Sequence, residues 1–115
     1  MDIESVDRHF VGKEPNVRVV YDRLLAGLRK FGPVKESPKQ TSIHLDNASG
    51  FAGVNTRKSY LLLNFRTDYK VESSRITKIE QHSARRWMHT VRLESESDVD
   101  AELLKWLRDA YSLAG

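Results

Sequence analysis

Apolar residues near the start of the chain recur with the period of an α-helix, and this pattern constrains the fold more than any other feature. Over residues 15–31 they fall at intervals of three and four positions, which places them on one side of a helix. They are Val17, Val20, Tyr21, Leu24, Leu25, Leu28 and Phe31. Pro15 suits a first helical turn, because its missing N–H would have no partner there. Gly32 and Pro33 end the pattern, since proline cannot continue a helix. We therefore predict an amphipathic helix over residues 15–31, whose apolar stripe must be buried against another layer.

A second helix is predicted at the other end of the chain. Its apolar stripe consists of Val99, Leu103, Trp106, Leu107, Ala110 and Tyr111. Ser97 predicts the N-cap, and Asp100 follows three residues later, as in a capping box. Asp98 and Glu102 add negative charge at the positive end of this helix. Two amphipathic helices in one short chain require an apolar layer that both can cover.

Between the two helices the apolar residues change to the alternation that is typical of β-strands. These segments are residues 41–45, 51–54, 60–65, 76–79 and 87–93. The segment 76–79 predicts a weak strand or a turn, whereas residues 60–65 are apolar on both sides and predict a central strand. The order predicts an α+β fold, a two-layer sandwich with the N- and C-terminal helices packed on one face of an antiparallel sheet of four to five strands. We place this single domain at residues 15–115, after an N-terminal arm at residues 1–14.

The chain contains no cysteine, which excludes disulfides, thiolate zinc sites and cysteine nucleophiles. His44, His82 and His89 are the histidines that could converge, but their spacing matches no zinc motif. The sequence holds no nucleophile elbow, phosphate-binding glycine loop or metalloprotease motif. We therefore predict a binding protein that is not an enzyme and has no catalytic residues, metal or cofactor. No apolar run reaches the ~20 residues of a membrane span, so we expect a cytoplasmic protein.

Positive charge is concentrated in the middle of the chain. Residues 51–93 carry nine Lys or Arg against three Asp or Glu, although the net charge of the whole chain is only +3. Together with the rings of Tyr60 and Trp87, these cations indicate a nucleic-acid-binding face that contacts phosphates and stacks bases. The alternative, cations that protect a sheet edge from aggregation, stays open. The candidate nucleic-acid-binding residues are Arg57, Lys58, Arg66, Arg75, Lys78, Arg85, Arg86 and Arg92.

The predicted sheet offers a second candidate surface. If both helices cover one face, the alternation leaves Leu62, or else Leu61 and Leu63, on the other face, beside Ser42 or His44 and together with Met88. An uncovered face with apolar side chains is typical of an interface with a partner protein or a second copy of the chain. A loop or the N-terminal arm folding over the face would explain the same pattern. The candidate interaction face is therefore His44, Leu62 and Met88.

The last third of the chain resembles a known group of domains. Arg86 and Trp87 precede a strand that ends at Leu93, and an acidic cap then leads into a helix that closes on Tyr111. This arrangement resembles the end of the YjbR-like (double-wing) domains. The resemblance implies a helix, an antiparallel sheet and a helix, with a loosely inferred role in DNA binding.

A closer resemblance is to an uncharacterised bacterial family of domains of unknown function, some members of which are labelled predicted transport proteins. It rests on the run from Leu25 to Pro33, on Arg57-Lys58 after the strand at Phe51, and on the final helix. It covers residues 15–113. Neither resemblance implies catalytic residues, and the transport label finds no membrane segment to support it in this sequence.

Overall fold

The computed structural model describes residues 5–115 and contains one sheet and two α-helices. The helices and 3-10 turns are η1 (Asp7–Phe10), α1 (Pro15–Leu28), η2 (Glu96–Asp98) and α2 (Ala101–Leu113). The strands are β1 (Lys35–Pro38), β2 (Ile43–Asp46), β3 (Gly50–Thr56), β4 (Leu61–Thr67), β5 (Ile76–Ser83) and β6 (Arg86–Leu93). No helix in this described part of the chain is long and apolar enough to cross a membrane.

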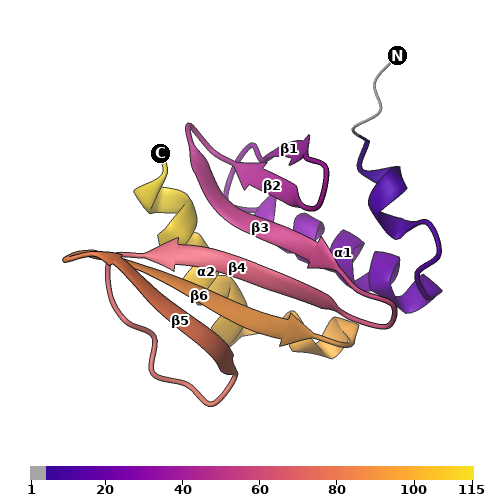
Figure 1. The fold of residues 1–115 in the computed structure, drawn as a ribbon. Coiled ribbons are helices and arrows are strands. Elements are labelled where there is room, and N and C mark those ends of the chain that lie inside the picture. Colours follow the sequence, from indigo (N-terminus) through magenta and orange to yellow (C-terminus); the bar gives the residue numbers. More distant parts are fainter. Residues whose placement is uncertain (1–4) are drawn as a thin grey trace.

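All neighbouring strands are antiparallel, in the order β1-β2-β3-β4-β6-β5. Both α-helices lie on the same face of the sheet (Figure 1). The predicted α+β fold is therefore confirmed, and β4 is central as its apolar sequence indicated. The sheet has six strands, one more than the upper end of the predicted range.

The additional strand is β1, which pairs with β2 so that Lys35 lies opposite Asp46. Its sequence is polar and ends in Pro38, and for this reason it carries no strand signal. Proline has no N–H to donate and is tolerated mainly at the edge of a sheet, which is where β1 lies. At the opposite edge, β5 is a full strand of eight residues rather than a weak turn. It lacks clear alternation because seven of its residues are exposed.

The two helix boundaries differ from the predicted ones. The helix α1 ends at Leu28, three residues before the predicted end, and Phe31 packs beyond the helix on the ring of Tyr111, with ring centres 6.0 Å apart. At α2 the predicted N-cap is wrong. Asp100 itself is the N-cap and accepts a hydrogen bond from the Leu103 N–H at 3.0 Å. A capping box one turn earlier joins Ser95 to Asp98, since a short 3-10 turn precedes the helix.

The core lies between the sheet and the helices. Leu61, Leu63 and Phe65 of β4 are completely buried on the helix-facing side. The ring of Phe65 stacks on His89 of β6 at 5.0 Å and on Trp106 of α2 at 6.0 Å, which ties the sheet to the helix layer. The alternate residues of β4 point to the opposite face, which neither helix covers (Figure 1).

The described part of the predicted arm, from residue 5, packs against the domain; residues 1–4 lie outside the described residues. Phe10 contacts the ring of Tyr21 at 5.2 Å. The Thr56 hydroxyl donates to the carbonyl of His9 at 2.6 Å, and the Glu14 N–H donates to the carbonyl of Lys58 at 2.8 Å. This segment therefore lies over the β3–β4 turn.

Candidate functional site

The uncovered face of the sheet brings the predicted interaction residues together. In the register, Asn64 of β4 lies opposite Gly53 of β3, and Gly53 lies opposite His44 of β2. The side chains of Leu62 and Met88 lie on the same face as that of Asn64, because β4 pairs with β6 in one uninterrupted register. His44, Leu62 and Met88 therefore share the face opposite the helices, and of the three leucines in β4 it is Leu62 that points outward.

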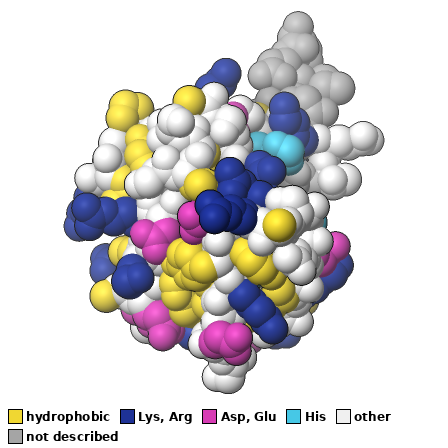
Figure 2. Space-filling view, turned by 90° about the vertical axis from the view of Figure 1, so that its left-hand side faces the viewer, with side chains coloured by type: hydrophobic (Ala, Val, Ile, Leu, Met, Phe, Trp, Pro, Cys, Tyr) yellow, Lys and Arg dark blue, Asp and Glu magenta, His cyan; other side chains and the backbone are white. Residues whose placement is uncertain are grey.

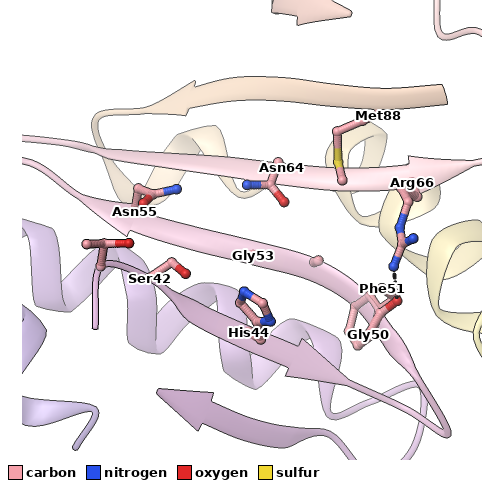
Figure 3. A pocket seen from close by; sticks show the side chains of 11 residues that line it. Ser42, His44, Gly50, Phe51, Gly53, Asn55, Asn64, Arg66 and Met88 are labelled. Atoms are coloured by element: carbon pink, nitrogen blue, oxygen red, sulfur yellow. Dashed lines mark hydrogen bonds between the residues drawn. The ribbon is translucent and has the colours of Figure 1, made fainter. Parts of the chain in front are cut away.

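A hollow of about 360 Å³ lies on this face, above the middle of β3 (Figure 3). Gly53 forms its floor, since a glycine leaves the surface of the strand open at this point. The hollow is lined by Thr41, Ser42, His44, Gly50, Phe51, Ala52, Gly53, Asn55, Asn64, Arg66 and Met88. In Figure 3, Ser42 and His44 of β2 border it on one side, and Asn64, Arg66 and Met88 border it on the other.

Three polar side chains that line the hollow have no hydrogen-bond partner in the described part of the chain. Within residues 5–115, the side chains of His44, Asn55 and Asn64 make no hydrogen bond. The amide of Asn64 extends across the strand, and a Cβ added at Gly53 would lie 2.9 Å from its Oδ1 atom. Glycine at position 53 therefore leaves room for the amide. A polar group with unused donors and acceptors can hydrogen-bond to a ligand without first breaking an internal bond.

Arg66 forms the charged end of the hollow. Its Nη2 atom donates to the carbonyl of Gly50 at 2.9 Å, which holds the guanidinium beside the β2–β3 turn. Arg66 also lines a second hollow of about 140 Å³ with Arg86, next to Ser49 and the C-terminal end of α2. Cations are favoured at this end of a helix, because the last carbonyl groups carry partial negative charge. Two arginines therefore line the same hollow where the face ends.

Figure 2 looks onto this end of the molecule, towards the β5–β6 turn, and shows basic side chains near its centre with acidic and hydrophobic ones around them. Arg85 lies in this turn, and Arg86 donates to its carbonyl at 2.8 Å. The second hollow joins the β2–β3 turn to β6 and α2, segments that are distant in sequence. Only the tertiary structure brings Arg66 and Arg86 together.

The other predicted basic residues do not join this group. Arg57 and Lys58 lie in the β3–β4 turn, at the opposite end of the sheet (Figure 1). A strand of seven residues separates the two ends by about 20 Å. The Lys58 side chain also has a hydrogen-bond partner there, since its Nζ atom donates to the carbonyl of Gly12 at 3.1 Å. The eight residues proposed from the sequence therefore do not form one basic face.

Three more of these residues have acidic partners. Arg75 binds Asp100 and Glu102 at 2.9 and 3.1 Å and lies over the ring of Trp106, so it fastens a loop to the start of α2. Lys78 pairs with Glu80 at 3.5 Å, and Arg92 pairs with Glu94 at 2.6 Å.

The two aromatic residues considered for base stacking do not line the hollow either. The ring of Tyr60 lies beneath the guanidinium of Arg92, 3.8 Å from the ring centre. Trp87 is half-buried. It lies two residues before His89 in β6, so both side chains are on the side of the sheet that faces the helices. Among the residues that line the hollow, aromatic stacking can therefore come only from the His44 ring, because the ring of Phe51 is buried against Tyr111.

Sequence reasoning missed Gly53, Asn55 and Asn64. A signal for two of them is present in hindsight, since Asn64 interrupts an otherwise apolar strand and Gly53 interrupts a strand segment that begins at Phe51. Within residues 5–115, no group of three or more His, Asp or Glu residues could hold a metal ion.

His89, by contrast, belongs to the core. Its Nε2 atom accepts a hydrogen bond from the Val71 N–H at 2.9 Å, which requires that this nitrogen carries no proton. Burial lowers the pKa of His89 below its usual value of 6.5, and the Phe65 carbonyl opposes this lowering in part. The folded protein therefore holds His89 neutral, with loop residues 68–75 fastened to β6 through Val71.

We expect acid to destabilise the protein through His89. Because the folded-state pKa lies below that of the unfolded chain, the unfolded chain binds more protons as the pH falls below about 6.5. The free energy of unfolding should be constant above that pH and then decline by at most about 1.4 kcal/mol per pH unit. Urea titrations at several pH values between 5 and 8 measure this slope. His89→Gln, which can still accept the Val71 hydrogen bond, should flatten it; a variant with the wild-type slope would exclude His89 as the source.

The comparisons with known proteins identify a family but no characterised relative. A family model described as a domain of unknown function, DUF5655, matches residues 6–114. No curated protein and no solved structure matches the chain. The match includes both α-helices, all six strands and every residue of the two hollows. It agrees with the resemblance to an uncharacterised domain family, whereas the relation to the double-wing domains and the transport label receive no support. The chain therefore belongs to the DUF5655 family of domains of unknown function.

Proposed function

We propose that this domain is a non-catalytic module that binds single-stranded nucleic acid on the uncovered face of its sheet. The observation that carries the proposal is the position of Asn55, Asn64 and His44, whose side chains have no internal partner in the described chain, beside two arginines at one end of the face. In this proposal the larger hollow receives a base, and Arg66 and Arg86 contact phosphates.

The composition of the larger hollow favours a base as its occupant. Asparagine amides present a donor and an acceptor side by side, which matches the edges of nucleobases. The glycine floor leaves a flat surface, and His44 and Met88 at the borders can contact the face of a ring. Bases of a single strand are free to enter such a hollow, whereas those of a duplex are stacked and paired. The hollow therefore fits an unpaired base better than a duplex.

Binding is favoured over catalysis by the arrangement of the same residues. Ser42 and His44 both line the hollow, but no hydrogen bond joins them, and Asp46 instead accepts a hydrogen bond from the Ser37 hydroxyl at 2.8 Å. A serine nucleophile needs a base within hydrogen-bond reach and a third group that orients the base. The hollow offers hydrogen bonds to a ligand rather than an activated nucleophile.

The phosphate contacts can be tested through their salt dependence. We expect Arg66→Gln/Arg86→Gln to flatten the slope of log affinity against log salt for a labelled single strand by about 1.4, because each lost phosphate contact removes about 0.7 for single strands. Fluorescence anisotropy between ~50 and ~200 mM salt measures this slope. The matched control is Arg23→Gln/Arg108→Gln, which removes the same charge from exposed positions on the two helices. If both double variants flattened the salt slope equally, the net charge of the protein, and not this end of the sheet, would account for the salt dependence of binding.

The base subsite needs a separate test, because a charged surface alone binds phosphates. Asn64→Leu should weaken binding about tenfold, the effect of losing roughly one pair of hydrogen bonds to a base, and should leave the salt slope unchanged. Wild-type protein that binds no single strand at ~50 mM salt, where phosphate contacts are strongest, would end the proposal. Tighter binding to a duplex than to a single strand would also contradict it.

The second candidate function is a protein-interaction or homodimerisation surface on the same face. The observation that favours it is that Leu62 and Met88 are both half-buried there and lie over neighbouring strands. The polar centre of the face makes it the weaker candidate, since stable dimer interfaces are mostly apolar at their core. If the chain did self-associate through this face, Leu62→Ser would abolish that self-association in sedimentation experiments while leaving nucleic-acid binding intact.

A further inference from the structure

The strand β5 forms a free edge of the sheet. It is the last strand in the order, and within residues 5–115 it pairs only with β6, so the backbone groups on its outer side have no strand partner there. It is eight residues long, contains no proline and is exposed at seven positions. The opposite edge, β1, has four residues and ends in Pro38, which cannot donate to a further strand. Of the two edges, β5 is the one that can accept another strand.

The sequence of β5 is complementary to itself in the antiparallel direction. If two copies pair about a two-fold axis through Ile79, each Lys78 lies opposite Glu80 of the other copy, and each Glu80 lies opposite Lys78. Opposite charges directly across an antiparallel pair are stabilising, and like charges are destabilising. The two residues already pair within one strand at 3.5 Å, so their side chains lie on the same side of the sheet. The axis therefore produces two favourable charge pairs at once.

The other side of the strand provides an apolar contact at the same axis. Ile79 is 37% exposed, which makes it one of three large hydrophobic residues that are exposed in the described chain. It lies opposite His89 in the register and so points to the helix-facing side, where the main contacts of α2 are with β3 and β4. Pairing through Ile79 would bring the two isoleucines together and remove apolar surface from water.

We propose that β5 pairs with β5 of a second copy of this chain, in antiparallel register about Ile79, to form a symmetric dimer with one continuous sheet of twelve strands. A two-fold contact uses the same surface on both copies and closes on itself. The β1 edges at the two ends of the long sheet carry proline, so the assembly stops at the dimer. Irregularities in pairing on both sides confine the regular part of β5 to Lys78–Gln81, which makes the contact short and the dimer weak. The inference does not depend on the proposed nucleic-acid binding.

Reversal of the charge pairs provides the first test. Sedimentation velocity of the wild-type chain up to roughly 1 mM, the upper end of the weak-affinity range, should show a monomer–dimer equilibrium. Lys78→Glu and Glu80→Lys should each raise the dissociation constant at least about tenfold, because each places like charges across both pairs. The double variant Lys78→Glu/Glu80→Lys restores opposite charges and should return the constant to within about threefold of the wild type. Failure of the double variant to recover would overturn the proposed register.

A cysteine at the axis provides the second test, and the chain has no other cysteine to interfere. Residues directly opposite in an antiparallel pair have Cα atoms about 4.5–5.5 Å apart, within the range of a disulfide. Ile79→Cys should therefore form a covalent dimer on mild oxidation. The matched control is Gln81→Cys, whose two copies would lie about 14 Å apart in this register and should cross-link much more slowly.

The remaining outcomes separate this dimer from other assemblies. Leu62→Ser lies on the uncovered face and should leave the dissociation constant unchanged, whereas a dimer formed through that face would be lost. Wild-type protein that stays monomeric up to roughly 1 mM, or equal cross-linking of the Ile79→Cys and Gln81→Cys variants, would overturn the proposal. Circular dichroism of each variant confirms that it is folded before its self-association is compared.

Discussion

Phe65→Ala should lower the free energy of unfolding by about 3–5 kcal/mol, the range for truncating a buried phenylalanine. Phe65 is completely buried in the central strand, and its ring stacks between His89 and Trp106. Truncation would remove the apolar contact between the sheet and α2 and leave a cavity that the surrounding rings fill only in part. Urea titration followed by circular dichroism at neutral pH measures the loss, with a decrease in the midpoint of more than roughly 1 M.

The control lies three residues earlier in the same strand. Leu62 points to the uncovered face and is half-buried, so Leu62→Ala should cost less than about 1.5 kcal/mol, well below the range for a buried leucine. The comparison tests the orientation of β4 directly, because a shift of one residue would exchange the two faces. Equal losses for the two variants would show that the assigned orientation is wrong.

Gly32→Ala should cost about 2–4 kcal/mol, although position 32 lies in a turn. Its φ angle of 153° is one that residues with a side chain rarely adopt, and such strain costs about 1–3 kcal/mol. A Cβ added there would lie 2.5 Å from the hydroxyl of Tyr111. That hydroxyl donates to the carbonyl of Pro33 at 2.9 Å, a bond worth about 1 kcal/mol that the new methyl group would break. Thermal and urea unfolding measure the combined loss.

Two further variants separate the cost of backbone strain at position 32 from the cost of the steric clash with Tyr111. Gly12→Ala introduces a Cβ at a φ angle of 76° with no atom within 4 Å, so it reports the conformational cost alone. Tyr111→Phe removes the hydroxyl that the new methyl group would meet. In the presence of Tyr111→Phe, Gly32→Ala should therefore cost less than it does in the wild type. Additive losses would contradict the collision with Tyr111.

Tyr111 explains why the Gly32-Pro33 turn and the last turn of α2 depend on each other. Besides its bond to Pro33, its ring contacts Phe31 and Phe51, and its backbone carbonyl accepts a hydrogen bond from the side chain of Asn47 at 2.9 Å. The turn after α1, the β2–β3 turn and the end of α2 therefore meet at one residue. The sequence suggested Gly32 as a helix stop, but its close approach to Tyr111 is a long-range contact.

Only some residues of the candidate site could be predicted from the sequence. The alternation of β2, β4 and β6 predicted that His44, Leu62 and Met88 could share a face, because side chains of a strand point alternately to its two sides. The opposing position of Gly53 and Asn64 depends on the pairing of β3 with β4. Local pattern does not specify this pairing, and so it did not reveal the hollow.

The sequence by itself determined the helices, most of the strands and the fold class. These features depend on the spacing of apolar residues along the chain, which is a local property. The tertiary structure decided which charged residues meet. It placed Arg57 and Arg86 at opposite ends of the sheet, brought Arg66 and Arg86 to the lining of one hollow, and paired Arg75 with Asp100. Charge acts through distance in space, and distance in space is set by strand order and register rather than by position in the sequence.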